Sequence, residues 1–221
     1  MISIRGLRIV YGRTVALDSI NVELSPGITG LFGQNASGKT TLLRVLAGLL
    51  APTDGTVLIE GRPVDAGDES LRRRIGYVGH DSGLYGRLDV RENLKLFAHL
   101  YGVPSERASR FLEALGLEER ASVPVRELSA GYKRRASVAR ALLHEPDILL
   151  LDEPYANLDD DAADLVSAAI RDWRGGGRLA VIATHGAKKV KAFADAGVIL
   201  RRGQVVVAGS YRREDRAGAA P

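Results

Sequence analysis

The sequence predicts an α/β fold with a mostly parallel core sheet, an antiparallel β subdomain at the N-terminus and an inserted α-helical subdomain. Three observations predict it. Residues 2–32 read as short β segments with a turn at 25–27. Uninterrupted apolar runs at 148–151 and 179–183 are typical of strands buried on both faces of a parallel sheet. Between about residues 83 and 140 the β pattern disappears and helical periodicity replaces it.

The expected elements follow in order along the chain. Strands are expected at residues 2–4, 7–10, 20–24 and 28–32, a helix at 39–49, and further strands at 56–60 and 75–78. In the insert, Val90, Leu94, Phe97 and Tyr101 recur at helical spacing. Two more helices are expected around 111–117 and at 136–143, another through 165–173, and a hairpin of 198–200 with 205–207.

Composition limits the class of protein. Of the 221 residues, 45% are hydrophobic, enough to bury the core of one domain, which we expect over residues 1–209 with a polar tail at 210–221. The net charge is +4, and short basic runs lie at residues 72–74, 133–135 and 212–213. We interpret these runs as solvated helix faces, so no nucleic-acid partner is expected.

Cysteine usage and hydropathy indicate where the protein acts. The sequence contains no Cys, which excludes disulfides and thiolate metal sites and fits a reducing compartment. The N-terminus lacks the apolar core of a signal peptide, and no stretch approaches the roughly 20 apolar residues that span a bilayer. We therefore expect a cytoplasmic protein that serves any membrane process from the water side.

Residues 33–40, GQNASGKT, carry the strongest motif. They satisfy G-x-x-x-x-G-K-[ST] between an expected strand and an expected helix, as a phosphate-binding loop requires. Glycines allow consecutive N–H groups to point at phosphate oxygens, and the helix N-terminus adds partial positive charge. Lys39 can reach the β- and γ-phosphates, and the Thr40 hydroxyl can bind Mg²⁺. The predicted phosphate-binding residues are Gly33, Asn35, Ala36, Ser37, Gly38, Lys39, Thr40 and Thr41.

A second element of such a site follows the apolar run at 148–151. Asp152 and Glu153 stand where that strand is expected to emerge from the sheet. We expect Asp152 to hold Mg²⁺, through water, and Glu153 to act as the general base on the attacking water. With the phosphate loop, these carboxylates predict a P-loop NTPase core.

Residues 128–132, LSAGY, indicate which family of P-loop NTPases the sequence resembles. They resemble the LSGGQ signature of ABC ATPases, with Ala130 and Tyr132 as departures. In that family the segment faces the γ-phosphate held by another subunit, so the resemblance implies a head-to-tail dimer with a second copy or a homologous ATPase subunit. It also implies that Ser129 and Gly131 bind ATP, and a Ser at a helix start is a suitable anion site.

Other motifs extend the resemblance over residues 1 to about 209. Tyr11 matches the aromatic residue that stacks on adenine, although a core strand tyrosine is the alternative. Asp159 ends a segment, 157–159, that resembles the D-loop of the dimer interface, with Asn157 where Ser or Ala is more usual. His185 matches the switch histidine that contacts the γ-phosphate and orients water.

One position departs from the family. Residues 76–80 read GYVGH, with His80 where the family usually has a Gln that senses Mg²⁺. We hypothesise that His80 replaces it, since an imidazole can bind a divalent cation or a water; a surface histidine is the alternative. The predicted catalytic residues are therefore Glu153, His185, Lys39 and His80, and the predicted metal ligands Thr40, Asp152 and His80.

The resemblance implies an ATPase that uses ATP and Mg²⁺ to power a separate integral membrane permease, from the inner face of the cell membrane. The family's docking region corresponds to residues 84–101, where Leu84, Tyr85 and Leu88 form either an exposed apolar groove or part of the core. Residues 79–80, 84–103 and 128–135 are similar to the ATP-binding subunits of haem exporters for cytochrome c maturation. Drug, lipid or polysaccharide exporters, and soluble ABC-type assembly or scaffold ATPases, are the alternatives.

Overall fold

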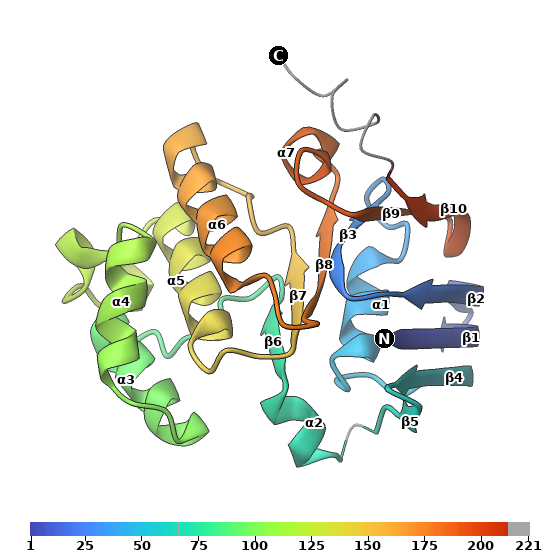
Figure 1. Cartoon of the computed structure of the whole chain (residues 1–221), viewed down its shortest axis with the longest axis horizontal. Coiled ribbons are helices and arrows are strands. Elements are labelled where there is room, and N and C mark those ends of the chain that lie inside the picture. The colour runs from blue at the N-terminus through green and yellow to red at the C-terminus, as the bar shows by residue number, and fades with distance from the viewer. Residues whose placement is uncertain (66, 212–221) are drawn as a thin grey trace.

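The computed structural model describes residues 1–65 and 67–211, and these residues form two β-sheets (Figure 1). The first sheet is antiparallel, in the order β2 (Thr14–Leu24), β1 (Ile2–Tyr11), β4 (Asp54–Ile59), β5 (Arg62–Pro63). The second has the order β10 (Gln204–Ser210), β9 (Ala196–Arg201), β3 (Gly27–Phe32), β8 (Leu179–Thr184), β7 (Ile148–Asp152), β6 (Ile75–Val78). Its strands run parallel except for the β9–β10 hairpin. The predicted fold class is confirmed.

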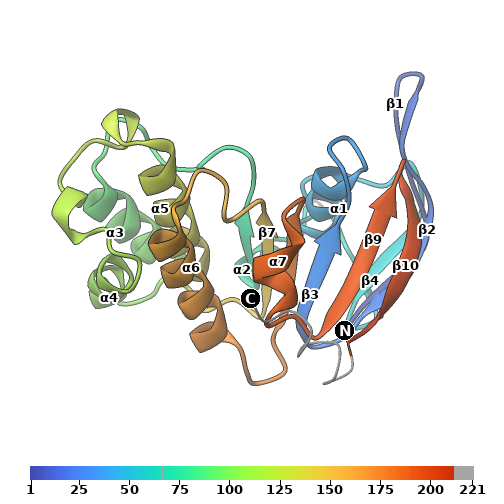
Figure 2. The same cartoon turned by 90° about the horizontal axis from the view of Figure 1, so that it is seen from above.

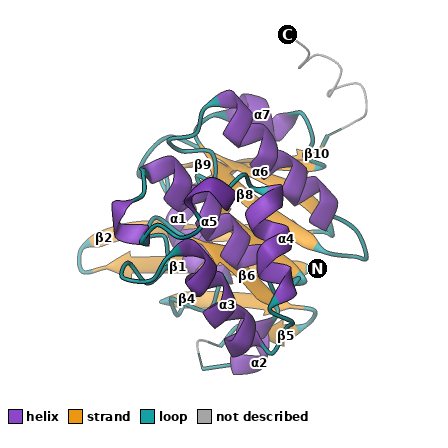
Figure 3. Ribbon diagram, turned by 90° about the vertical axis from the view of Figure 1, so that its left-hand side faces the viewer, coloured by secondary structure: helices purple, strands orange, loops and turns teal. Residues whose placement is uncertain are grey.

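The helices divide into two groups around the second sheet. They are α1 (Lys39–Leu46), α2 (Glu69–Arg73), α3 (Val90–Tyr101), α4 (Glu106–Ala114), α5 (Ala130–Leu142), α6 (Asp160–Trp173) and α7 (Ala187–Lys191), with 3-10 turns η1 (Glu118–Arg120) and η2 (Val125–Glu127). Helix α1 lies between the two sheets, whereas α3, α4, α5 and α6 lie on the other side of the second sheet (Figures 1 and 2). Seen from that side, helices α3 to α6 stand in front of the strands (Figure 3).

Two hydrophobic clusters hold these layers together, and the central strands contribute to both. In β7, Leu149 and Leu151 belong to the cluster formed with the helical side, whereas Ile148 and Leu150 pack on the side of α1 and the first sheet. Successive side chains of a strand point to opposite faces, so a strand buried on both faces must be apolar at every position. This is the physical reason for the uninterrupted apolar run.

Several element boundaries differ from those predicted. Strand β1 is continuous from Ile2 to Tyr11, because a bulge at residues 5–6 breaks the alternation without ending the strand, and β2 begins at Thr14 rather than residue 20. Helix α1 ends at Leu46, two residues before Gly48, whose positive φ (65°) is incompatible with a continuing helix. Helices α4 and α5 begin earlier than predicted. The short elements β5, α2 and α7 were not predicted, because each spans too few residues to show a period.

Helix α3 illustrates how local sequence sets the boundaries of the insert. The Asp89 carboxylate accepts a hydrogen bond from the Glu92 N–H at 2.7 Å, and the Glu92 carboxylate accepts one from the Asp89 N–H at 2.9 Å. This capping box satisfies N–H groups that have no partner within the helix. Gly102, with φ of 68°, ends the helix. Within the described ranges, no helix is long and apolar enough to cross a membrane.

Candidate functional site

The loop between β3 and α1 forms a tight cradle at the carboxyl end of the second sheet. Gly38 has φ of 105°, a conformation that L side chains rarely adopt, and a Cβ there would also meet Leu17. At Gly33, a Cβ would collide with the Leu200 carbonyl and the Ser37 hydroxyl. The loop can therefore close on itself only with glycine at these positions.

Lys39 directs its charge into this cradle. Its Nζ donates hydrogen bonds to the Gly33 carbonyl at 2.8 Å and the Gln34 carbonyl at 3.1 Å, and the residue is 6% exposed. A buried ammonium held by backbone carbonyls at the rim of a loop of N–H groups is suited to bind an anion such as a phosphate.

Thr40 and Asp152 meet at the edge of the same cavity. The Thr40 Oγ1 donates a 2.6 Å hydrogen bond to the Asp152 Oδ2, although the residues are far apart in sequence. Burial raises the pKa of Asp152 and nearby Glu153 adds to the rise, while the bond from Thr40 and the charges of Lys39 and Arg134 oppose it. A hydroxyl and a carboxylate are the oxygen donors that Mg²⁺ prefers, so this pair fits the metal.

Glu153 is held at the ends of β7 and β8. Its Oε1 accepts a hydrogen bond from the His185 N–H at 2.9 Å and lies 2.9 Å from the His185 Nδ1. Its Oε2 accepts a bond from the Thr184 hydroxyl at 3.0 Å, and its backbone adopts a positive φ of 48°. Because β7 and β8 are adjacent and parallel, their carboxyl ends bring these two predicted catalytic side chains together.

Residues 35–41 of the loop, Asp152 and Glu153 open onto the phosphate cavity, of about 520 Å³, whereas His185 lines a neighbouring hollow that shares Glu153. The predicted residues that line the phosphate cavity are Asn35, Ala36, Ser37, Gly38, Lys39, Thr40, Thr41, His80, Asp152 and Glu153. His80 lies at its edge, with its side chain 94% exposed. The lining also contains Thr14, Val15, Ala16 and Arg134, which sequence reasoning did not select.

Tyr11 lies at the tip of the β1–β2 hairpin, paired with Thr14. It is 45% exposed and therefore not a core tyrosine, the alternative interpretation of this residue. It does not line the cavity itself, but the next strand contributes Thr14 to the cavity wall. The role of Tyr11 in adenine stacking stays a prediction.

The predicted residues of the signature and D-loop segments lie outside the cavity. Ser129 is the N-cap of α5 and accepts a hydrogen bond from the Tyr132 N–H at 3.3 Å. A Cβ on Gly131 would approach the Asn157 carbonyl to 2.8 Å, so the two segments are in contact. Asp159 is the N-cap of α6, bonded to the Ala162 N–H at 2.8 Å. One chain therefore does not bring Ser129, Gly131 and Asp159 to its own phosphate loop.

The interpretation of residues 133–135 as a solvated helix face was wrong. Arg135 is 9% exposed and donates hydrogen bonds to the Leu115 and Gly116 carbonyls at 2.6 and 2.7 Å. Arg134 is partly buried and reaches the cavity. Arg134 contacts the ends of the core strands and Arg135 contacts the helical insert, so α5 is covered on both of these sides. A run of charge in one sequence does not reveal which sides of a helix are covered. The run at 212–213 and nearly all of the predicted tail lie outside the described residues.

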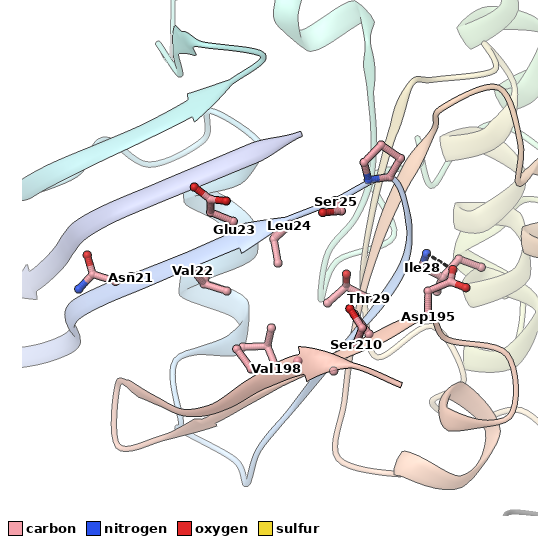
Figure 4. A pocket seen from close by; sticks show the side chains of 15 residues that line it. Asn21, Val22, Glu23, Leu24, Ser25, Ile28, Thr29, Asp195, Val198 and Ser210 are labelled. Carbon is pink, nitrogen blue, oxygen red and sulfur yellow. Dashed lines mark hydrogen bonds between the residues drawn. The ribbon is translucent and has the colours of Figure 1, made fainter. Parts of the chain in front are cut away.

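A second hollow, of about 270 Å³, lies between the end of β2 and strands β3, β9 and β10 (Figure 4). The carboxylate of Asp195, in its lining, accepts hydrogen bonds from the Ile28 N–H at 2.8 Å and from Arg174 at 2.6 Å. The Asp195 carboxylate is engaged in holding the fold, and the phosphate loop does not line the hollow. We therefore assign this hollow no part in the nucleotide site.

The family described as "ABC transporter" matches residues 17–156, which include the phosphate loop, the signature segment and both carboxylates. This chain belongs to the ABC transporter family. The ABC transporter relatives include a cytochrome c biogenesis ATP-binding export protein, CcmA, of Cupriavidus necator, 43% identical over 81% of this chain and 81% of its own length. A Nod factor export ATP-binding protein I of Cupriavidus metallidurans is 38% identical over 84% of this chain, which spans 63% of that relative.

Solved ABC cassettes share the whole architecture. A dimeric ATP-binding cassette in a post-hydrolysis state, bound to ADP and Pi, superposes with a TM-score of 0.86 at 26% identity, covering 96% of this chain and 99% of the other. The predicted family and its ATPase class are thus confirmed. The role of each individual site residue stays a prediction.

Proposed function

We propose that this chain is the ATP-hydrolysing subunit of an ABC exporter, one ATPase domain over residues 1–209 that powers a separate membrane permease. The observation that carries the proposal is the convergence of three elements at one edge of the second sheet. They are the Lys39 cradle, the Thr40–Asp152 pair and the Glu153–His185 pair. Together these supply phosphate binding, a place for Mg²⁺ and a base beside the phosphates.

In the proposed mechanism, loop N–H groups and Lys39 bind the phosphates of ATP and stabilise the charge on the transferring phosphoryl group. Mg²⁺, held by Thr40 and Asp152, supplies charge neutralisation when bound. Glu153 accepts the proton of the attacking water, whose oxygen bonds to the γ-phosphorus as the β–γ bond breaks and ADP leaves with the bridging oxygen. His185 holds the carboxylate of Glu153 in place and orients the water. His80, at the cavity edge, takes the Mg²⁺-sensing role of the family's usual Gln.

The proposal includes a head-to-tail dimer. Ser129 and Gly131 lie outside their own chain's cavity, so a second cassette is needed to bring an equivalent pair to the phosphates. The dimeric form of the solved cassette supports this arrangement. ATP binding then closes the dimer and hydrolysis releases it, which is a two-state change that a permease can follow.

We place the permease contact at residues 84–101, at the inner face of the cell membrane. Tyr85 is 54% exposed and its ring lies 6.1 Å from that of Phe97, whereas Leu84 and Leu88 are half-buried. This arrangement supports the exposed-groove interpretation for Tyr85 more than for the two leucines.

Both relatives are named as export proteins, and this supports an exporter rather than an importer. Haem export for cytochrome c maturation is the finer proposal, supported by the 43% identity to the CcmA relative. Export of a drug, lipid or polysaccharide is the second candidate, favoured by the repeated likeness to Nod factor export proteins.

Isolation of the native complex tests the proposal. The tagged chain is expressed in its own cell, membranes are gently solubilised, and copurifying proteins are identified. A stoichiometric multi-span membrane protein is expected, and haem absorbance beside it would favour the haem branch. Recovery from the soluble fraction alone, without a membrane partner, would contradict the exporter and favour an assembly or scaffold ATPase.

A further inference from the structure

Arg134, on the signature helix α5, bridges two strand ends of the nucleotide cavity. Its Nη1 donates a hydrogen bond to the Gly79 carbonyl at 2.8 Å and lies 3.4 Å from the Asp152 carbonyl. Its side chain lines the cavity together with Lys39 and Glu153. One guanidinium nitrogen therefore touches the loop that carries His80 and the strand that carries the predicted metal ligand.

The two Arg134 hydrogen bonds lie where the pairing between β6 and β7 ends. Strands β6 and β7 pair in parallel up to Val78 opposite Leu151. Gly79 directly follows β6 and Asp152 is the last residue of β7, so each lies one position beyond the last β6–β7 pair. Since the ladder ends there, Arg134 supplies a connection between the two carbonyls that the backbone no longer provides.

The neighbouring arginines of α5 are engaged differently. Arg135 bonds to carbonyls within the helical insert. Arg140 donates to the Tyr77 carbonyl at 2.6 Å and stacks over Phe97, away from the cavity. Thus Arg134 and Arg140 both hold the segment at the end of β6, but of these three arginines Arg134 is the one that lines the cavity.

Arg134 also places positive charge beside the predicted catalytic carboxylates. Burial lowers the pKa of Arg134, and the charges of Asp152 and Glu153 oppose that shift. An arginine remains protonated in such surroundings, so the side chain is a permanent cation. It also lines a smaller hollow with His80, Lys133 and Asn157, between the signature and D-loop segments.

We propose that Arg134 is a positioning residue of the ATPase site. By holding the carbonyls of Gly79 and Asp152, it sets the place of the His80 loop relative to the metal-binding edge and makes the geometry of that edge depend on the position of α5. The inference rests on the nucleotide site proposed above and extends it, because it assigns to the signature helix a contact with its own chain's carboxylate strand.

Three variants of the full chain test the proposal: Arg134→Met, Arg134→Lys, and Arg110→Met as a control that removes an exposed charge of α4 outside the cavity. The first measurement is amide hydrogen exchange in nucleotide-free protein. Arg134→Met is expected to raise exchange at residues 79–82 by about tenfold relative to wild type, as loss of a charge-assisted hydrogen bond predicts. The β1–β2 hairpin and the Arg110→Met protein should be unchanged.

The second measurement is the Mg²⁺ concentration needed for half-maximal binding of a fluorescent ATP analogue. Arg134→Met is expected to raise it about fivefold or more, because the carboxylate edge is no longer held. Arg134→Lys keeps the charge, but its shorter, strongly hydrated side chain does not place a donor where Nη1 stands, so it should raise exchange at 79–82 while changing the Mg²⁺ requirement less.

Unchanged exchange at 79–82 in Arg134→Met would overturn the proposal. Weaker nucleotide binding with unchanged exchange would also overturn it, since Arg134 would then contact the nucleotide directly. If the methionine variant fails to fold, amide exchange at 79–82 in Arg134→Lys provides the same test, and unchanged exchange there would overturn the proposal. Failure of the wild-type chain to bind MgATP would instead contradict the proposed function. The exchange comparison between wild type and Arg134→Met would still test whether Arg134 holds residues 79–82.

Discussion

The Glu153 carboxylate and the His185 imidazole are in direct contact, with Oε1 and Nδ1 2.9 Å apart. The same oxygen accepts the His185 backbone N–H at 2.9 Å. Two contacts from one residue determine the orientation of the carboxylate, while the imidazole remains 68% exposed and lines a neighbouring hollow that shares Glu153 with the phosphate cavity. Glu153 is therefore held in one orientation, whereas the exposed imidazole of His185 is free to contact a ligand.

Replacing Glu153 with Gln should abolish turnover while leaving nucleotide binding intact. The amide keeps the size of the side chain but cannot accept a proton, and removal of a general base typically lowers kcat by about 10²- to 10⁴-fold. We expect a stable ATP-bound dimer, detected by size-exclusion chromatography with and without MgATP. A variant that hydrolyses ATP at the wild-type rate would contradict the assignment of Glu153 as the base.

Replacing Thr40 with Val should weaken the Mg²⁺ site. The change removes the hydroxyl that donates to Asp152 at 2.6 Å and leaves a buried carboxylate oxygen without that partner. The loss of such a bond costs about 1–3 kcal/mol. Titration of Mg²⁺ against bound ATP analogue should show a requirement raised about tenfold, and Thr40→Ser, which keeps the hydroxyl, should stay near wild type. Equal effects of Val and Ser would show that the hydroxyl is not the relevant group.

Replacing His80 with Ala should alter function without altering stability. The side chain is 94% exposed, so its removal breaks no packing and should leave the melting temperature unchanged. If His80 acts in place of the family's usual Gln, the Mg²⁺ dependence of ATP hydrolysis and its stimulation by the permease should both decrease. Unchanged basal and permease-coupled activity would leave His80 as a surface histidine.

His144 predicts a pH dependence of stability. Its ring stacks on Tyr101 with centroids 3.9 Å apart, and burial, with a smaller effect from the charge of Arg140, lowers its pKa to about 4. The unfolded chain therefore binds more protons than the folded one between about pH 4 and 6.5. The free energy of unfolding should fall as the pH is lowered through that window, by about 1–2 kcal/mol after allowance for solvent screening.

The control for this prediction is His144→Phe, which keeps a ring on Tyr101 but cannot be protonated. Denaturant unfolding at pH 7 and pH 4.5 should show a smaller difference for the variant than for wild type. Equal differences in both proteins would assign the acid sensitivity to other groups.

The sequence by itself determined the fold class and the central motifs. The apolar runs of β7 and β8 predicted buried parallel strands, and they are buried on both faces. Residues 33–40 and the Asp152–Glu153 step predicted the phosphate loop and the carboxylates that line the cavity with it. Both signals are local: glycine conformations, a fixed spacing to Lys39, and polar residues at the end of a strand are properties of consecutive residues.

Only the tertiary structure decided which distant groups meet. It brought Glu153 onto His185, because these residues follow the neighbouring parallel strands β7 and β8, and it brought Thr40 onto Asp152, because α1 packs against the end of β7. The order of these elements in space cannot be deduced from chain position. It also showed that Arg134 and Arg135, in a run that the sequence suggests is solvated, contact the core strands and the helical insert respectively. A sequence displays charge and periodicity, but the side of a helix that is covered depends on what packs against it, and that is decided by long-range contacts.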